Sequence, residues 1–288
     1  MSFEEITGTI VRWSVAVEAL GAVGAELKLK QAGRGPAPEV AAALKQVAVA
    51  AGLPDLDDLN PQERAVVLAI VDLYSHQMTD MLEQPGRSPG WTFNDPVLLD
   101  GWGRGSTVVP GAILATIPGL GPVGDFLDIG TGVGLLAVAA TNVWSEAHIT
   151  GIDIWEPSLE RARAHVAAAN AGDRITLRHQ NVTELDDENT FDLVWFPTFF
   201  MTEDVIAAAL TAVLRATKPG GTVALGLMEL PPDPLAQAVT TLRTIRSGGT
   251  QLDPKRAHEL LEQAGFSDAQ EVPKTWPLPL ALVVGRKG

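Results

Sequence analysis

The sequence predicts an α/β fold in which a mostly parallel sheet carries helices on both faces, preceded by a helical segment. After Pro122, short apolar runs typical of strands alternate with stretches of helical periodicity. Before that point, apolar residues recur at steps of three and four, which places them on one side of a helix. A chain of 288 residues corresponds to about two domains. We therefore expect a division into residues 1–110 and 111–288.

The helical segment opens with an apolar seam whose steps alternate between four and three. Its members are Ile6, Ile10, Trp13, Val17, Leu20, Gly24 and Leu27. A second helix ends at Gly52, and a third begins at its cap Asn60 and continues to about Leu82. The seam has two interpretations, which are packing within its own domain and a homodimer interface.

Residues 84–110 are rich in Gly and Pro and include three aromatic residues, Trp91, Phe93 and Trp102. Such a segment is typical of a long connection, and long connections are often functional lids. We expect residues 1–110 to form a helical cap with this connection at its end.

The remainder alternates strands with helices. Strands are predicted at 124–129, 148–154, 174–179, 191–196 and 221–227, and helices at 133–143, 156–170, 201–216 and 233–246. Two further strands, at 268–273 and 279–285, have no helix between them. Because parallel neighbours need a crossover, we expect these two to pair antiparallel or to lie at an edge.

Functional residues gather where the first predicted strand meets its helix, in Phe126-Leu-Asp-Ile-Gly-Thr-Gly-Val-Gly134. Glycines are needed where a backbone turns tightly and approaches a ligand. The spacing differs from G-x-G-x-x-G, and no Lys-Ser/Thr follows as in a phosphate-binding loop. Asp128 would oppose a pyrophosphate but suits a cationic amine. The loop therefore indicates a nucleoside ligand without phosphates.

Asp153 ends the second predicted strand, where an acidic side chain can accept hydrogen bonds from both ribose hydroxyls. Its alternative role is structural, because Glu156 and Pro157 begin a helix just after it.

In these motifs the chain resembles the class I S-adenosylmethionine-dependent methyltransferases over about residues 110–288. The matching segments, in order, are Phe126–Gly134, Gly151–Ile154, Phe191–Trp195, Leu214–Gly221 and Ala264–Phe266, followed by the paired terminal strands. The resemblance implies a Rossmann-like sheet of seven strands with the last one inserted antiparallel, and S-adenosylmethionine as the cofactor.

The resemblance also implies roles for single residues. The loop Gly130, Thr131, Gly132 and Gly134 would hold the methionine and ribose portion of the cofactor. Asp128 would lie near its amino group, and Asp153 would bind its ribose. Ile154 and Trp155 would flank the adenine, although Trp155 could instead be a half-exposed residue at a helix start.

Two further contacts with the cofactor are implied less directly. Many family members have an Asp where this chain has Asn181, whose amide oxygen can still accept from the adenine amino group. Val182 offers only its backbone. Arg104 could bind the cofactor carboxylate or pair with Asp100.

The methyl acceptor is expected in an apolar, aromatic pocket. The fourth strand ends in Trp195-Phe-Pro-Thr-Phe-Phe-Met201, which lacks the Asn/Asp-Pro-Pro-aromatic signature of nucleobase and glutamine amide methyltransferases. Candidate residues are Trp195, Phe196, Phe199 and Phe200, with Trp91, Phe93 and Trp102 closing the pocket. Ordinary core packing is the alternative.

Candidates for a general base are His76, on the third helix of the cap, and Glu229, just beyond the fifth strand. Plant-type O-methyltransferases have a His beyond that strand, and this chain has Gly226-Leu-Met-Glu229. The clustered Asp and Asn residues of metal-dependent catechol-type enzymes are absent from the sequence, so we expect no metal.

Composition restricts the partners and the compartment. The chain has 35 acidic and 21 basic residues, a net charge of −14 and no cysteine. The acidic balance argues against nucleic acid and anionic membranes, and the lack of cysteine excludes thiolate chemistry. The acidic N-terminus is unlike a signal peptide, and we expect a cytoplasmic protein without a membrane span.

Together these observations predict a methyltransferase that modifies a small apolar or aromatic acceptor, at oxygen, by in-line displacement. The alternatives are an N-methyltransferase of a small heterocycle, a protein methyltransferase, and a non-catalytic protein that binds the cofactor and dimerises. We expect a small-molecule substrate and a homodimer formed through the N-terminal helices.

Overall fold

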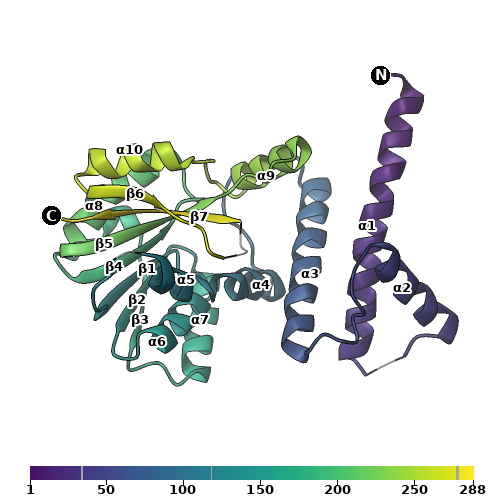
Figure 1. The fold of residues 1–288 in the computed structure, drawn as a ribbon, viewed down its shortest axis with the longest axis horizontal. Coiled ribbons are helices and arrows are strands. Elements are labelled where there is room, and N and C mark those ends of the chain that lie inside the picture. Colours follow the sequence, from purple (N-terminus) through teal and green to yellow (C-terminus); the bar gives the residue numbers. More distant parts are fainter. Residues whose placement is uncertain (34, 118, 277–278) are drawn as a thin grey trace. The chain divides into compact units, whose positions relative to one another are not determined.

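The computed structural model describes residues 1–33, 35–117, 119–276 and 279–288, which form two compact units (Figure 1). The first unit comprises Met1–Gly86 and Asp95–Gly101, and the second comprises Arg87–Asn94 and Trp102–Gly288. The boundary expected at residue 110 lies inside the second unit, because residues 87–94 and those after Gly101 belong to that unit.

The first unit consists mainly of helices α1 (Phe3–Gln31), α2 (Pro38–Ala50) and α3 (Pro61–Glu83). The predicted cap of α3 is confirmed. The Asn60 side chain accepts from the Glu63 backbone N–H at 3.0 Å, and the Glu63 carboxylate accepts from the Asn60 N–H at 2.8 Å. The two hydrogen bonds satisfy N–H groups that the first turn of a helix leaves without partners.

The apolar seam of α1 divides into two parts. Its C-terminal part is buried with α2 and α3, where Gly24 lies so close to Val71 that a Cβ would approach the Val71 Cγ1 atom to 2.8 Å. Its N-terminal part is exposed, with Ile10 at 53% and Trp13 at 50% of their accessible surface. Of the helices that the structure describes, α1 alone is long and apolar enough to cross a membrane. A buried helix or a signal sequence passes the same test.

The second unit contains a sheet of seven strands in the order β3-β2-β1-β4-β5-β7-β6. The strands are β1 (Asp125–Ile129), β2 (His148–Asp153), β3 (Ile175–His179), β4 (Phe191–Pro197), β5 (Thr217–Met228), β6 (Ser267–Val272) and β7 (Leu280–Arg286). Strands β1 to β5 are parallel, and β7 lies antiparallel between β5 and β6. This confirms the Rossmann-like sheet.

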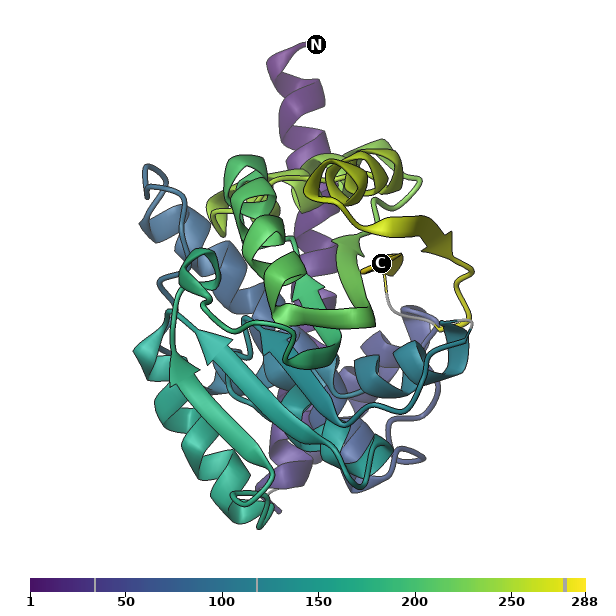
Figure 2. The same cartoon turned by 90° about the vertical axis from the view of Figure 1, so that its left-hand side faces the viewer.

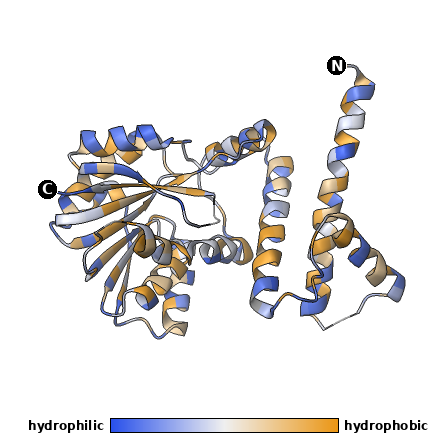
Figure 3. Ribbon diagram, in the orientation of Figure 1, coloured by the Kyte–Doolittle hydropathy of each residue, from blue (hydrophilic) through white to orange (hydrophobic). Residues whose placement is uncertain are grey.

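Helices cover both faces of the sheet (Figure 2). They are α6 (Leu135–Val143), α7 (Glu156–Ala168), α8 (Glu203–Ala216) and α10 (Pro254–Ala264). The short 3-10 helix η1 (Val182–Glu184) follows β3, and α9 (Pro234–Arg246) follows β5. Successive strand residues enter opposite cores: Leu127 packs with α8 and α10, and Phe126 packs with α6. Apolar residues therefore dominate the strands (Figure 3).

The segment predicted as a long connection is helical in its second half, which corrects the expectation for residues 84–110. It contains α4 (Pro96–Ser106), and α5 (Val109–Thr116) follows. Asp95 caps α4 by accepting from the Val97 N–H at 2.8 Å. The glycines of α4, which in the sequence look like loop residues, allow close packing, since a Cβ on Gly103 would overlap the side chain of Val133. Because glycine is typical of loops, the sequence pattern did not indicate a helix here.

Candidate active site

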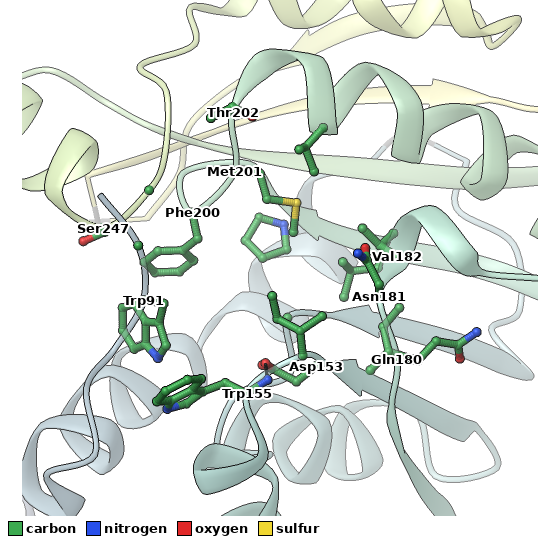
Figure 4. A pocket seen from close by; sticks show the side chains of 18 of the residues that line it. Trp91, Asp153, Trp155, Gln180, Asn181, Val182, Phe200, Met201, Thr202 and Ser247 are labelled. Atoms are coloured by element: carbon green, nitrogen blue, oxygen red, sulfur yellow. Dashed lines mark hydrogen bonds between the residues drawn. The ribbon is translucent and has the colours of Figure 1, made fainter. Parts of the chain in front are cut away.

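The second unit contains a cavity of about 450 Å³ at the carboxyl ends of its central strands (Figure 4). Ile129 ends β1, Asp153 ends β2 and Pro197 ends β4, and all three line the cavity. Binding sites of parallel sheets lie at this edge, where the strand order reverses. Here the reversal falls between β1 and β4.

The glycine loop reaches the cavity through Gly130, and all three of its glycines have positive φ: 64° at Gly130, 56° at Gly132 and 75° at Gly134. A side chain at these positions would be strained. A Cβ on Gly134 would approach the Ala162 Cβ to 3.0 Å, so this glycine also brings the loop against α7. The Thr131 N–H donates to the Ile152 carbonyl at 3.0 Å and fastens the loop to β2.

Asp128 lies beneath the loop instead of in the cavity wall. Only 1% of its surface is exposed, and its Oδ2 atom accepts from the Thr131 hydroxyl at 2.7 Å. Burial raises the pKa of Asp128 to about 7, although the Thr131 hydrogen bond opposes the shift. The carboxylate faces Thr131 and holds the loop, and its contact with the cofactor's amino group stays a prediction.

Asp153 joins the glycine loop to the end of β2. Its Oδ2 atom accepts from the Gly132 N–H and its Oδ1 atom from the Trp155 N–H, both at 2.8 Å. Burial raises its pKa, and these backbone hydrogen bonds oppose the shift. Because each carboxylate oxygen can accept a second hydrogen bond, the side chain retains capacity for a pair of ligand hydroxyls.

The predicted adenine contacts lie together around the same end of the cavity. Ile154, Trp155, Asn181 and Val182 all line it. The Asn181 Oδ1 atom accepts from the Thr183 N–H at 3.1 Å and caps η1, so its second lone pair is the one available to a ligand. Sequence reasoning missed the neighbouring Gln180, which has no distinctive pattern around it.

Aromatic side chains form the other end of the cavity. Trp91 and Phe200 line it, with ring centroids 4.9 Å apart in an edge-to-face arrangement. Phe93, Trp102 and Phe199 lie behind them, with centroids 5.2 and 6.1 Å from Trp91 and 4.7 Å from Phe200, respectively. Trp91 and Phe200 are therefore wall residues of the cavity, and their contact with a methyl acceptor stays a prediction.

Trp195 and Phe196 belong to the core, which corrects their prediction as substrate contacts. Phe196 is fully buried among residues that include Leu210, and Trp195 is buried on the opposite face of the sheet. The ring of Trp195 fills the space that Gly226 leaves on β5. Their alternation along β4 turns both side chains away from the strand end, where the cavity lies.

Within the second unit, the candidates Arg104 and Glu229 are not among the residues of the cavity wall. Arg104 is exposed on α4. Glu229 forms an ion pair with Lys274. His76 belongs to the first unit, where its Nε2 atom lies 3.4 Å from the Asp95 carboxylate, and its role as a base stays a prediction. Within the described residues, no cluster of three or more His, Cys, Asp or Glu could hold a metal ion.

Several wall residues come from segments that the motifs did not indicate. Pro89 and Gly90 precede Trp91, Ser247 and Gly248 follow α9, and Met201 follows the aromatic run. The remaining wall residues are Ile129, Ile152, Pro197, Thr202 and Val205. In the sequence, the Gly248-Gly249 pair after α9 was the only feature that could have indicated a cavity segment, and such a pair is equally typical of a helix end.

Residues 126–221 match the family model described as a methyltransferase domain. This segment, a third of the chain, is therefore similar to methyltransferase domains. The match covers all three glycines of the loop and Asp153, and it agrees with the predicted family of S-adenosylmethionine-dependent methyltransferases.

Curated relatives of the domain act on different acceptors. The chain is 30% identical over 146 residues to 27-O-demethylrifamycin SV methyltransferase of Amycolatopsis mediterranei, covering 49% of this chain and 53% of that enzyme. It is 32% identical over 97 residues to tRNA1(Val) (adenine(37)-N6)-methyltransferase of Vibrio campbellii, covering 33% and 41%. The methyltransferase domain thus spans about half or less of the length of the curated relatives it matches.

Solved methyltransferase structures share the fold along nearly the whole chain. Human N-acetylserotonin methyltransferase, in complex with S-adenosylmethionine, superposes with a TM-score of 0.72 at 16% identity and covers 100% of both chains. Mitomycin 7-O-methyltransferase superposes with a TM-score of 0.67 at 17% identity and covers 99% of this chain and 98% of that one.

Proposed function

We propose that the protein transfers the methyl group of S-adenosylmethionine to the oxygen of a small apolar or aromatic acceptor. The observation that carries this proposal is the division of one cavity into two chemically different ends. Asp153, Asn181 and Gly130 lie at the polar end, and Trp91 and Phe200 lie at the aromatic end. A cofactor and a flat apolar molecule would meet between them.

The polar end fits the nucleoside part of the cofactor. Asp153 would accept from the ribose hydroxyls, and Asn181 would accept from the adenine amino group with its second lone pair. Gly130 has no side chain to block close approach to the loop, and its φ of 64° favours glycine. When bound, S-adenosylmethionine supplies a methyl group that its sulfonium already activates for in-line displacement.

At the aromatic end, the protein's contribution is to orient the acceptor and exclude water, which can lower a barrier by several kcal/mol. Among the described residues of the cavity wall, Asp153 has the only ionisable side chain. An acceptor hydroxyl would therefore lose its proton to solvent. This favours hydroxyls that are more acidic than those of alcohols, such as those of phenols, whose pKa is about 10 and is lowered by electron-withdrawing substituents.

Methylation of an RNA base, as in the Vibrio relative, is the weaker candidate. The net charge of −14 opposes a phosphate backbone. Beyond Pro197, the Thr198 hydroxyl donates to the Gly226 carbonyl at 3.0 Å and is buried. That strand end consequently presents no free polar side chain to an exocyclic amine. N-methylation of a small heterocycle and methylation of a protein side chain are outcomes that the following experiment separates.

The test measures transfer of labelled methyl groups from S-adenosylmethionine into matched panels of phenols, heterocyclic amines, carboxylates, peptides and tRNA. We expect labelled product from phenols, with a rate that rises as the pKa of the phenol falls toward neutrality. Transfer only into amines, peptides or RNA would replace the proposed acceptor class. Binding of the cofactor without transfer to any class would favour a non-catalytic protein.

We also propose that the exposed half of α1 pairs with the same face of a second copy. Ile6, Ile10, Trp13 and Val17 repeat at the spacing of a two-helix seam and remain exposed in the single chain. Ile10→Asp should shift the mass measured by light scattering from dimer to monomer. Val15→Asp is the matched control, because Val15 is exposed on the opposite side of the seam. A monomeric wild-type protein would refute the proposal.

A further inference from the structure

Residues 87–94, which we call the strap, carry Trp91 to the aromatic end of the cavity and are held by three sets of hydrogen bonds. The Arg87 guanidinium donates to the Gly90 carbonyl at 2.8 Å and to the Thr92 hydroxyl at 3.2 Å, which shapes the strap internally. The Gly90 N–H donates to the Arg246 carbonyl at 3.1 Å at the end of α9.

The third attachment connects the strap to the cofactor end. The indole N–H of Trp155 donates to the Phe93 carbonyl at 2.8 Å. Trp155 directly follows β2, and its own backbone N–H donates to Asp153 at 2.8 Å. A short route therefore runs from the Asp153 carboxylate through Trp155 to the strap, and Phe93 packs edge-to-face against Trp91 at 5.2 Å.

The glycines on both sides make this attachment tight. A Cβ on Gly248, after α9, would lie 3.1 Å from the Gly90 Cα atom, so the strap backbone lies directly against the end of α9. The strap is thus held between α9 at one point and Trp155 at another. The Trp155 contact thus adds a second backbone attachment to the one at Gly90, beside the packing of the Trp91 ring against Phe200.

We propose that Trp155 is a positioning residue that couples the two ends of the cavity: by holding Phe93 in the strap, it fixes Trp91 against the acceptor when the cofactor occupies Asp153. The proposal rests on the function proposed above and deepens it, since it assigns Trp155 a role beyond flanking the adenine. Cofactor binding reduces the mobility of the backbone at Asp153 and Trp155. Through the indole hydrogen bond, it also reduces the mobility of the strap.

Hydrogen exchange measured by mass spectrometry tests the coupling on the full-length protein, with S-adenosylhomocysteine as the probe. Trp155→Phe keeps an aromatic ring, removes the indole N–H donor and reduces the ring volume. Without ligand, we expect exchange in residues 87–94 to be about five-fold faster than in the wild type, because one hydrogen bond is lost. In the wild type, the probe should slow exchange in both 87–94 and 130–134. In the variant, it should slow exchange only in 130–134.

Trp276→Phe is the matched control. The Trp276 indole N–H donates to the Leu280 carbonyl at 2.9 Å, an equivalent hydrogen bond at another place in the same unit. It should leave exchange in 87–94 unchanged. With 2-naphthol as a neutral aromatic probe, Trp155→Phe should weaken binding about five-fold in the presence of S-adenosylhomocysteine, and Trp276→Phe should not.

Equal exchange of residues 87–94 in the wild type and in Trp155→Phe would overturn the coupling. A general rise of exchange throughout the second unit would also overturn it, because Trp155 would then be a stabilising residue only. Failure of S-adenosylhomocysteine to bind the wild type would instead contradict the proposed function. The comparison of ligand-free proteins would still report on the Trp155 hydrogen bond, so the two failures are distinguishable.

Discussion

At the scale of single residues, two neighbouring carboxylates have different tasks because their surroundings differ. Asp153 lines the cavity and accepts two backbone N–H groups, whereas Asp128 is buried below the loop with the Thr131 hydroxyl as its partner. Their charges repel, and the charge of Asp153 contributes to the raised pKa of Asp128. One carboxylate is thus placed to bind a ligand, and the other holds the loop.

Asp153→Asn should weaken binding of S-adenosylhomocysteine. The amide has one acceptor oxygen, so either the Gly132 or the Trp155 N–H loses its partner, and the charged acceptor for ribose disappears. We expect a loss of about ten- to one hundred-fold in affinity by titration calorimetry, since a hydrogen bond to a charged group contributes about 1.5–3 kcal/mol. The exposed Asp173→Asn is the control. Unchanged affinity would show that ribose binds elsewhere.

The wild-type affinity should also depend on pH. Because burial raises the pKa of Asp153, the carboxylate takes up its proton at a higher pH than an ordinary Asp. Affinity for S-adenosylhomocysteine should therefore decline on acidification before the pH reaches about 4, the range of an exposed Asp. Titration calorimetry from pH 8 to pH 4.5 checks this, and a constant affinity over that range would contradict it.

Asp128→Asn should stabilise the protein at neutral pH. The folded-state pKa of about 7 lies above the ordinary value of 3.8 for an Asp, so the native state holds a proton that the unfolded state releases. The contribution of Asp128 to the free energy of unfolding is therefore fully present below pH 4. It falls by at most about 4 kcal/mol as the pH rises to 7. Urea unfolding of the variant should lack this decline. A parallel decline in both proteins would contradict the assignment.

At the scale of elements, the aromatic end of the cavity depends on segments that are far apart in the sequence and in contact in the fold. The loop after β4 carries Phe199 and Phe200, and the segment after α9 packs against it. Thr250 donates its backbone N–H to the Met201 carbonyl at 3.0 Å. A Cβ on Gly249 would overlap the Phe199 carbonyl oxygen, so only glycine permits this approach.

Gly249→Ala should separate these two segments. Since the obstacle is backbone, we expect the free energy of unfolding to fall by about 1–3 kcal/mol, as in overpacked sites, and binding of 2-naphthol to weaken at least as much as in Trp155→Phe. Urea unfolding and calorimetry measure the two effects. Gly172→Ala is the control, because a Cβ at Gly172 meets open space. Equal effects of both substitutions would contradict the packing argument.

Most elements of the second unit were predictable. The strands β1 to β4 agree with the prediction to within one residue. Buried parallel strands appear in the sequence as short apolar runs, and the helices between them separate these runs clearly. Helix α4 was missed because its glycines serve packing against Val133 rather than turns. Trp195 and Phe196 were misplaced because an aromatic run after a strand reads the same whether it enters the core or lines a pocket.

At the scale of the whole molecule, the helical unit and the sheet-bearing unit each have their own core. The first unit's core is small, with five buried apolar residues in its cluster, and much of α1 remains exposed. The proposed pairing of α1 with a second copy would bury this surface. The sheet-bearing unit contains the entire cavity described above.

A ligand that binds only the folded protein raises its melting temperature. At about one hundred times its dissociation constant, S-adenosylhomocysteine would stabilise by about 2.7 kcal/mol. For a unit of this size that corresponds to a rise of about 5–10 °C. NAD should give none, since the loop lacks the dinucleotide spacing. A rise with NAD alone would contradict the methyltransferase assignment of the cavity.

The sequence by itself determined the sheet, the glycine loop and the place of Asp153, because these depend on local spacing, on positive φ and on the burial of strand residues. Tertiary structure alone decided which aromatic residues face the cavity, that Asp128 lies beneath the loop, and that Trp155 holds the strap. These depend on contacts between residues as far apart as Phe93 and Trp155, or Phe199 and Gly249. The local spacing of residues in the sequence does not predict such long-range contacts.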